Sequence, residues 1–149
     1  MTTSSAIDLD LAVFLAEVCE LTYAQYHHGG DFTPPAGYQV VKPFKCRVFG
    51  IEEWFGFVLR SQERAVVAFR GTQSDIDYIG DGDAVELPCP LSADAGRVHQ
   101  GFLSIYDSCR PTVMAALKGL PGRLPLCITG HSLGAALATL CAFDAAANL

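Results

Sequence analysis

The chain has 149 residues, 50% of them hydrophobic and 17% charged, and this composition excludes an intrinsically disordered protein. Its formal net charge is −6 and its Lys and Arg residues are dispersed, which argues against nucleic acid and anionic membrane surfaces as partners. A chain of this length is typical of one folding unit, so we expect residues 1–149 to form a single domain.

The N-terminal residues and the cysteines predict a cytoplasmic protein. Residues 1–10 contain two acids and no Lys or Arg, so the basic start of a secretory signal is missing. No apolar run approaches the roughly 18 residues that span a bilayer. The six cysteines form no Cys-x-x-Cys pair and have no His at metal-ligand spacing. We therefore expect buried, reduced thiols, no metal and no cofactor.

An amphipathic helix is predicted near the N-terminus, because apolar residues recur there at helical spacing. These residues are Ile7, Leu11, Phe14, Leu15, Val18 and Leu21. We expect the helix to end near residues 27–30, where glycine supplies a left-handed cap. Residues 34–37, with two prolines and a glycine, predict a turn.

Three β-strands are predicted next. Residues 38–49 and 54–59 are rich in branched and aromatic side chains. The polar residues 61–64 are short enough to close a hairpin onto residues 65–69. This last run is apolar on both faces, as a central strand must be.

The middle of the chain is predicted to be irregular over residues 70–96, with one helical turn around 75–79. A second amphipathic helix is predicted next, and Pro111 should kink this helix or divide it in two. Its apolar face comprises Phe102, Ile105, Tyr106, Cys109, Val113 and Leu117. Residues 124–129 predict a short buried strand, and residues 133–147 an Ala-rich helix. The alternation of strands and helices predicts an α/β domain.

A five-residue pattern suggests the chemistry. Gly130, His131, Ser132, Leu133 and Gly134 satisfy G-x-S-x-G between a predicted strand and a predicted helix, which is the context of a nucleophile elbow. In such a turn the serine hydroxyl projects beside the positive end of the helix dipole. Ser132 is therefore the candidate nucleophile, and the N–H of Leu133 is a candidate oxyanion donor.

Three motifs in register, at residues 66–72, 98–102 and 128–138, resemble the class 3 (fungal-type) lipases, and the resemblance runs from about residue 40 to the end of the chain. It implies a serine ester hydrolase acting on carboxylic esters of lipids, on an incomplete α/β-hydrolase fold with a mixed sheet flanked by helices. It also implies that Thr72 is the second oxyanion donor and that residues 74–81 resemble a lid. That lid would open at a lipid interface through Ile76, Tyr78 and Ile79.

A general base and its orienting acid are missing from the expected positions. After Ser132 the chain has no His, and its one acid, Asp144, lies twelve residues on, about 18 Å along the helix at 1.5 Å per residue. Among the histidines, we expect His131 to face away from the site, His99 to give structural support, and His27 and His28 to cap a helix.

Three explanations of the missing residues remain open: the chain is a fragment of a full lipase, one half of a split enzyme completed by a C-terminal half, or a degenerate interaction domain. In each case we expect an exposed apolar patch on the last helix. Its members are Leu133, Leu137, Leu140, Cys141 and Phe143.

A calcium-binding loop is the rival interpretation of the acidic segment. Six residues fit the EF-hand template: Asp75, Asp77, Gly80, Asp81, Asp83 and Glu86. Ile79 at position 5 offers no side-chain oxygen, and prolines follow where a helix should. We therefore expect an acidic, solvated loop.

Overall fold

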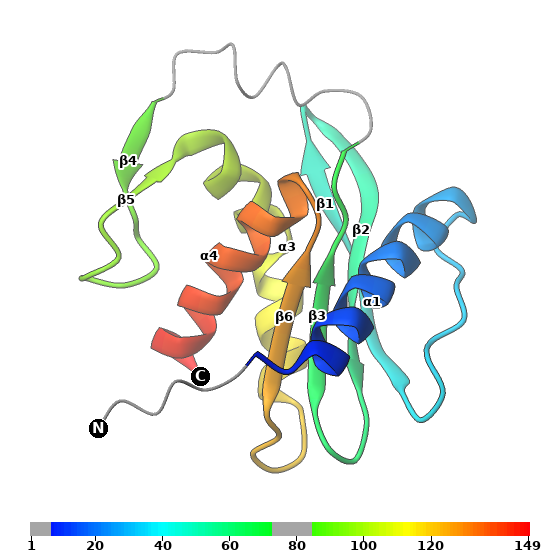
Figure 1. Cartoon of the computed structure of the whole chain (residues 1–149). Helices are drawn as coiled ribbons and strands as arrows, with labels where there is room; N and C mark the ends of the chain where they lie inside the picture. Colours follow the sequence, from blue (N-terminus) through cyan, green and yellow to red (C-terminus); the bar gives the residue numbers. More distant parts are fainter. Residues whose placement is uncertain (1–6, 73–84) are drawn as a thin grey trace.

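The computed structural model describes residues 7–72 and 85–149. Within them the predicted mixed sheet flanked by helices is confirmed (Figure 1). The predicted helical turn at 75–79 and the lid at 74–81 lie outside the described residues. The described helices are all too short or too polar to cross a membrane.

Four strands form the central sheet in the order β1-β2-β3-β6. They are β1 (Gln39–Val48), β2 (Ile51–Arg60), β3 (Ala65–Phe69) and β6 (Leu126–Gly130). The pairs β1–β2 and β2–β3 are antiparallel, whereas β3 and β6 are parallel. All five residues of β3 are buried, which confirms it as the central strand.

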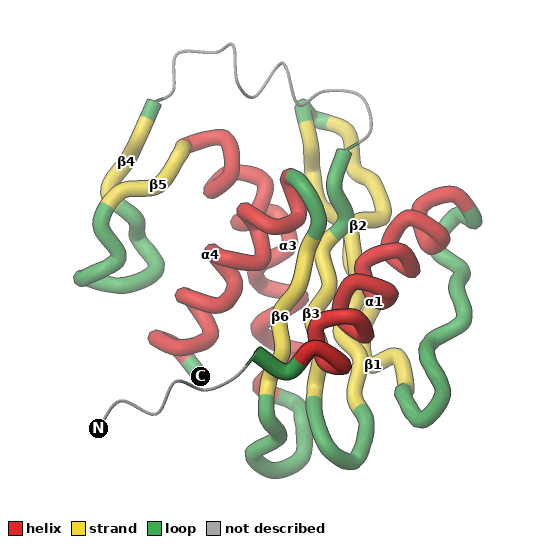
Figure 2. The backbone as a smooth tube through the Cα atoms, in the orientation of Figure 1, coloured by secondary structure: helices red, strands yellow, loops and turns green. Residues whose placement is uncertain are grey.

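Helices cover both faces of this sheet (Figure 2). Helix α1 (Leu9–His27) packs on one face, and helices α3 (Gln100–Lys118) and α4 (Leu133–Asn148) pack on the other. The larger core lies on the α3–α4 side and the smaller one beneath α1. A separate two-stranded sheet pairs β4 (Glu86–Pro88) with β5 (Arg97–His99).

The helices differ from the prediction in two details. Pro111 does not divide α3, which is one continuous helix because its packing on β1 and α4 offsets the lost hydrogen bond, whereas a kink at Pro111 stays a prediction. Ile7 precedes α1 and is 79% exposed, so it is not part of the buried face. The predicted end of α1 is confirmed, because His28 is the C-cap and Gly29 has a φ of 66°.

The strands also differ in part from the prediction. The second strand starts earlier than expected, at Ile51, because Phe49 and Gly50 have φ values of 49° and 82° and make a two-residue hairpin. Strand β4 lies in a segment that was predicted to be irregular. The predicted burial of residues 124–129 was wrong: β6 is half-buried, since within the described chain it pairs with β3 alone.

The predicted apolar patch on α4 was mostly wrong. Leu133, Leu137 and Cys141 are buried, because α4 packs against β3, β6 and α3. Leu140 is half-buried, and Phe143, at 44% exposure, is the one member of the set that projects into solvent.

Candidate active site

The predicted motifs at residues 66–72 and 128–138 meet at one edge of the sheet. Strands β3 and β6 are parallel and in register, with Phe69 opposite Gly130 at their carboxyl ends. The segment after β3, residues 70–72, therefore leaves the sheet beside the segment after β6, residues 131–133. In open α/β sheets this is the edge where ligands bind.

The chain reverses sharply at Ser132. This residue has φ 55° and ψ −124°, a backbone conformation that serine rarely adopts, and α4 begins at the next residue. Ser132 is half-buried, and its side chain makes no capping hydrogen bond to α4. The N–H of Leu133 is the first of α4 and has no acceptor within the helix. One hydroxyl and one N–H that has no acceptor within the helix are thus adjacent at the positive end of α4.

The glycines of the motif are required by close backbone approaches. A Cβ at Gly130 would stand 2.1 Å from the carbonyl oxygen of Gly134. A Cβ at Gly134 would stand 2.3 Å from the carbonyl oxygen of Phe69. Side-chain carbons essentially never come this close to an oxygen, so both positions exclude every residue except glycine. The elbow is packed directly onto the end of β3.

Thr72 lies on the β3 side of the same edge. Its hydroxyl oxygen is buried and has no hydrogen-bond partner within the described chain. An unsatisfied buried hydroxyl costs about 1–3 kcal/mol. Thr72 is therefore a candidate to supply a polar group at this edge.

Arg70, two residues earlier, is almost completely buried and anchors this segment. Its Nη2 donates to Glu53 Oε2 at 2.8 Å, and its Nε donates to the carbonyl of Trp54 at 3.1 Å. Its guanidinium lies over the Tyr26 ring at 3.9 Å and the Phe55 ring at 4.7 Å. The Arg-Gly-Thr segment is therefore fixed to β2 and to the end of α1.

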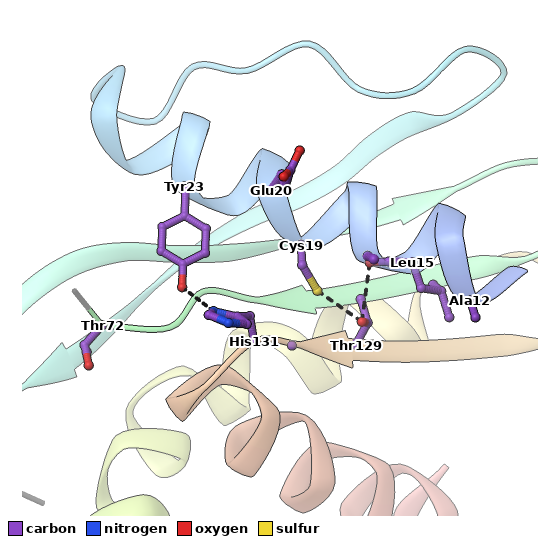
Figure 3. Close-up of a pocket in the computed structure, with 10 residues that line it drawn as sticks. Ala12, Leu15, Cys19, Glu20, Tyr23, Thr72, Thr129 and His131 are labelled. Atoms are coloured by element: carbon purple, nitrogen blue, oxygen red, sulfur yellow. Dashed lines mark hydrogen bonds between the residues drawn. The ribbon is translucent and has the colours of Figure 1, made fainter. Parts of the chain in front are cut away.

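A cavity of about 940 Å³ opens between α1 and β6, next to the elbow (Figure 3). Residues of α1 line one side, and Thr72, Thr129, Gly130 and His131 line the other. Tyr23 of α1 points toward His131, and its hydroxyl is 2.8 Å from His131 Nδ1. His131 is thus held on the α1 side of the turn.

The other predicted histidines and Asp144 have structural contacts. His99 caps α3, because its Nδ1 accepts from the N–H of Gly101 at 3.0 Å. His27 and His28 are exposed at the end of α1, as expected. Asp144 is fully buried and accepts two hydrogen bonds from Arg110, at 2.6 and 2.9 Å.

Most residues of the rival calcium loop lie outside the described chain. Glu86, its last member, forms an ion pair with Arg97 at 3.5 Å. In the described part of the chain, no three His, Cys, Asp or Glu side chains are grouped so that they could hold a metal ion.

Sequence reasoning missed Tyr23 and Gly71. Tyr23 approaches the elbow from 108 residues away, so no local pattern could reveal the contact. Gly71 was noted only as part of a motif. A Cβ there would stand 2.6 Å from both the His131 carbonyl oxygen and the Tyr23 hydroxyl.

Comparisons with known proteins agree with this geometry. The family model for class 3 lipases matches residues 66–149. The rice protein phospholipase A1-II 6 (Oryza sativa subsp. japonica) is 35% identical over 133 residues, covering 70% of this chain and 32% of its own length. The lipase of Rhizomucor miehei is 35% identical over 88 residues, covering 56% of this chain and 24% of its own length.

Solved structures give the same fold. A structure of the Rhizomucor miehei triacylglyceride lipase matches with a TM-score of 0.71 and 21% identity, over 94% of this chain and 56% of that one. A fungal lipase described for an unusual buried polar cluster matches with a TM-score of 0.72 and 26% identity, over 97% and 58%.

The fold and the strand–turn–helix elbow define the α/β-hydrolase fold. Within that class, the chain belongs to the class 3 lipase family. It spans about a third of the length of the rice relative and somewhat over half of the fungal lipase structures.

Proposed function

We propose that this chain carries the nucleophile and both oxyanion donors of a lipase-type serine ester hydrolase. The observation that supports this most directly is the convergence of two loops at one sheet edge. Ser132, with its positive φ, follows β6, and Thr72, whose hydroxyl has no partner among the described residues, follows β3. The names of the relatives, lipase and phospholipase A1, favour a carboxylic ester of a lipid as substrate.

In the proposed reaction Ser132 Oγ bonds to the ester carbonyl carbon while its proton passes to a general base. The N–H of Leu133, with the N–H and hydroxyl of Thr72, stabilises the oxyanion, an effect worth roughly 3–4 kcal/mol per donor in such enzymes. Collapse of the tetrahedral intermediate expels the alcohol, which takes up the proton, and leaves an acyl-enzyme. Water then releases the fatty acid and restores the serine.

The base and its orienting acid would come from outside residues 1–149. The contacts of His99 and His131 support this, because each ring already has a partner on a neighbouring element or helix end. Asp144 is neutralised by Arg110 deep in the α3–α4 interface. We infer that the 149 residues form one domain unit, that they are inactive alone, and that downstream sequence or a complementing C-terminal half restores activity.

Three further features belong to the same proposal. Residues 74–81 act as a lid that contacts lipid, the protein is cytoplasmic, and it needs neither a metal nor a cofactor. A second candidate, a catalytically inactive interaction domain, is favoured by the engagement of His99 and His131.

Labelling with a fluorophosphonate separates the two candidates. The polypeptide that includes the sequence after Leu149 should react at Ser132, and the Ser132→Ala variant should not. The 149-residue chain by itself should react far more slowly, because no base activates the hydroxyl. Failure of the longer polypeptide to react, although it folds, would support the inactive domain.

A further inference from the structure

A tyrosine on α1 is bonded directly to the residue before the proposed nucleophile. The Tyr23 hydroxyl lies 2.8 Å from His131 Nδ1, and the two rings meet edge to face with centroids 6.0 Å apart. Figure 3 shows the Tyr23 side chain extending from α1 to His131 beside Thr72. The contact joins the first helix of the domain to the elbow.

The same hydroxyl also touches the loop after β3. A Cβ built on Gly71 would stand 2.6 Å from the Tyr23 oxygen, 2.6 Å from the His131 carbonyl oxygen and 3.0 Å from Ser132 Cβ. Three segments therefore meet at Gly71 without room for a side chain. The Tyr23 hydroxyl lies close to Gly71 on one side of this junction and is bonded to the His131 ring on the other.

Each loop at the junction leads directly to one proposed oxyanion donor. Thr72 follows Gly71, and Leu133 follows Ser132. The carbonyl oxygen of His131 accepts from the N–H of Gly134 at 2.9 Å, so the backbone of His131 is also part of the first turn of α4. The bond from Tyr23 holds His131 where its backbone lies beside Gly71, and it therefore constrains the spacing of the two donors.

We propose that Tyr23, acting through His131, is a positioning residue that holds the Thr72 and Leu133 donors at the separation needed to bind one oxyanion. The inference rests on the proposed function and deepens it. Tyr23 does not touch the reacting atoms in this mechanism. Since donors aimed at the oxyanion act in the transition state, loss of the bond should slow the chemical step and leave probe binding unchanged.

Other contacts hold α1 on the sheet, so the hydroxyl can be removed without undocking the helix. Cys19 Sγ lies 3.1 Å from Thr129 Oγ1, and Gln25 Nε2 donates to the Gly56 carbonyl at 3.1 Å. Val18 is completely buried beneath α1. The Tyr23→Phe variant should therefore fold and unfold like the wild type.

The test compares Tyr23→Phe with His131→Asn, His131→Phe and the control Tyr38→Phe in the polypeptide that includes the sequence after Leu149. Tyr38 is on the same face of the sheet and stacks on Phe14, away from the elbow. Asn offers a polar atom near the position of His Nδ1, so it can keep the bond to Tyr23, whereas Phe cannot.

The measured quantity is the maximal rate of fluorophosphonate labelling at saturating probe, and it should differ among these variants. Tyr23→Phe and His131→Phe should each lower that rate about fivefold, the equivalent of one hydrogen bond. The probe concentration that gives half of the maximal rate should not change. His131→Asn should stay near the wild type. The double variant Tyr23→Phe/His131→Phe should be no slower than either single variant, because both remove the same bond.

Amide hydrogen exchange gives a readout that does not depend on activity. In the 149-residue chain, Tyr23→Phe should speed exchange at Gly71, Thr72 and Gly134, while Tyr38→Phe should not. Unchanged exchange together with an unchanged maximal labelling rate in Tyr23→Phe would overturn the inference while Ser132 stays the nucleophile. If the wild type does not react at all, the proposed function fails and the inference fails with it.

Discussion

The α-carbon of Gly134 lies against the end of β3, so closely that a Cβ there would stand 2.3 Å from the carbonyl oxygen of Phe69. The neighbouring carbonyl oxygen of Arg70 would be 2.6 Å away. Both are backbone atoms of a central strand and the loop that follows it, so neither can move without disturbing the sheet.

Gly134→Ala should therefore lower the free energy of unfolding by about 3 kcal/mol, because overpacking against backbone cannot relax. Urea denaturation measures this. The matched control is Gly119→Ala, where the added carbon would stand 3.4 Å from the Ala115 carbonyl oxygen in an ordinary αR conformation. Equal losses in the two variants would show that the contact with β3 is not the cause.

The ion pair between Arg70 and Glu53 should stabilise the loop that carries Thr72. Arg70→Ala leaves the Glu53 carboxylate without its partner and empties a space between two aromatic rings, so we expect a loss of about 3 kcal/mol. Glu53→Gln should cost less, about 1 kcal/mol, because the Glu53 side chain is 29% exposed and Gln can still accept.

Arg64→Ala is the control for the loss of a surface charge. Arg64 and Glu63 are 3.9 Å apart, and the Glu63 side chain is 82% exposed, so this variant should stay within about 0.5 kcal/mol of the wild type. Thermal unfolding of the wild type and the three variants ranks them by stability. Arg70→Ala with the stability of Arg64→Ala would contradict an anchoring role.

The stability of the α3–α4 interface should fall in acid. Burial raises the pKa of Asp144, but hydrogen bonds from Arg110, Tyr106 and Asn148 outweigh it and hold that pKa below the ordinary 3.8. A carboxyl with a lowered pKa in the folded state stabilises the fold above its unfolded pKa. That contribution is lost as the pH falls from about 5 through the folded pKa.

Asp144→Asn should remove this acid-side slope and cost about 2 kcal/mol at pH 7. The cost is moderated because Arg110 is 38% exposed and regains water. Unfolding free energies measured from pH 7 to pH 3 test it, with Asp94→Asn on the exposed surface as the charge-matched control. An unchanged slope in Asp144→Asn would show that another carboxyl is responsible.

Thiol reactivity should divide the six free cysteines into two groups. Burial raises the pKa of Cys141 to about 12, and burial also raises the pKa of Cys46, so neither forms the reactive thiolate. Cys89 and Cys127 are only half-buried. We expect these two to react first with a maleimide, and all six to react in denaturant; early modification of Cys46 would contradict the packing of β1 on α3.

The order of the elements followed from the sequence because hydrophobic patterning carries it. The all-apolar run at β3 and the elbow between β6 and α4 are local features. The hairpin turn at Phe49 was not predicted, because phenylalanine is not a recognisable turn residue even though its φ here is 49°. Burial of α4 was underestimated, since it depends on partners distant in the chain.

Only part of the candidate site could be predicted from the sequence. The role of Ser132 can be proposed from its contiguous motif alone, and the role of Thr72 from the resemblance of its motif to the class 3 lipases. The junction at Gly71 depends on Tyr23 and His131, which are 108 positions apart, and on the register of two parallel strands. Neither is encoded in any short stretch of residues.

The backbone of Ser132 has a consequence for heat resistance. A residue held in a conformation of this kind costs on the order of 1–3 kcal/mol, and it persists only while its surroundings enforce it. A small local loosening between β3 and α4 would let the peptide relax and withdraw the hydroxyl. In the proposed hydrolase, reactivity of Ser132 toward a fluorophosphonate should therefore be lost on warming at temperatures where the remaining sheet is still intact.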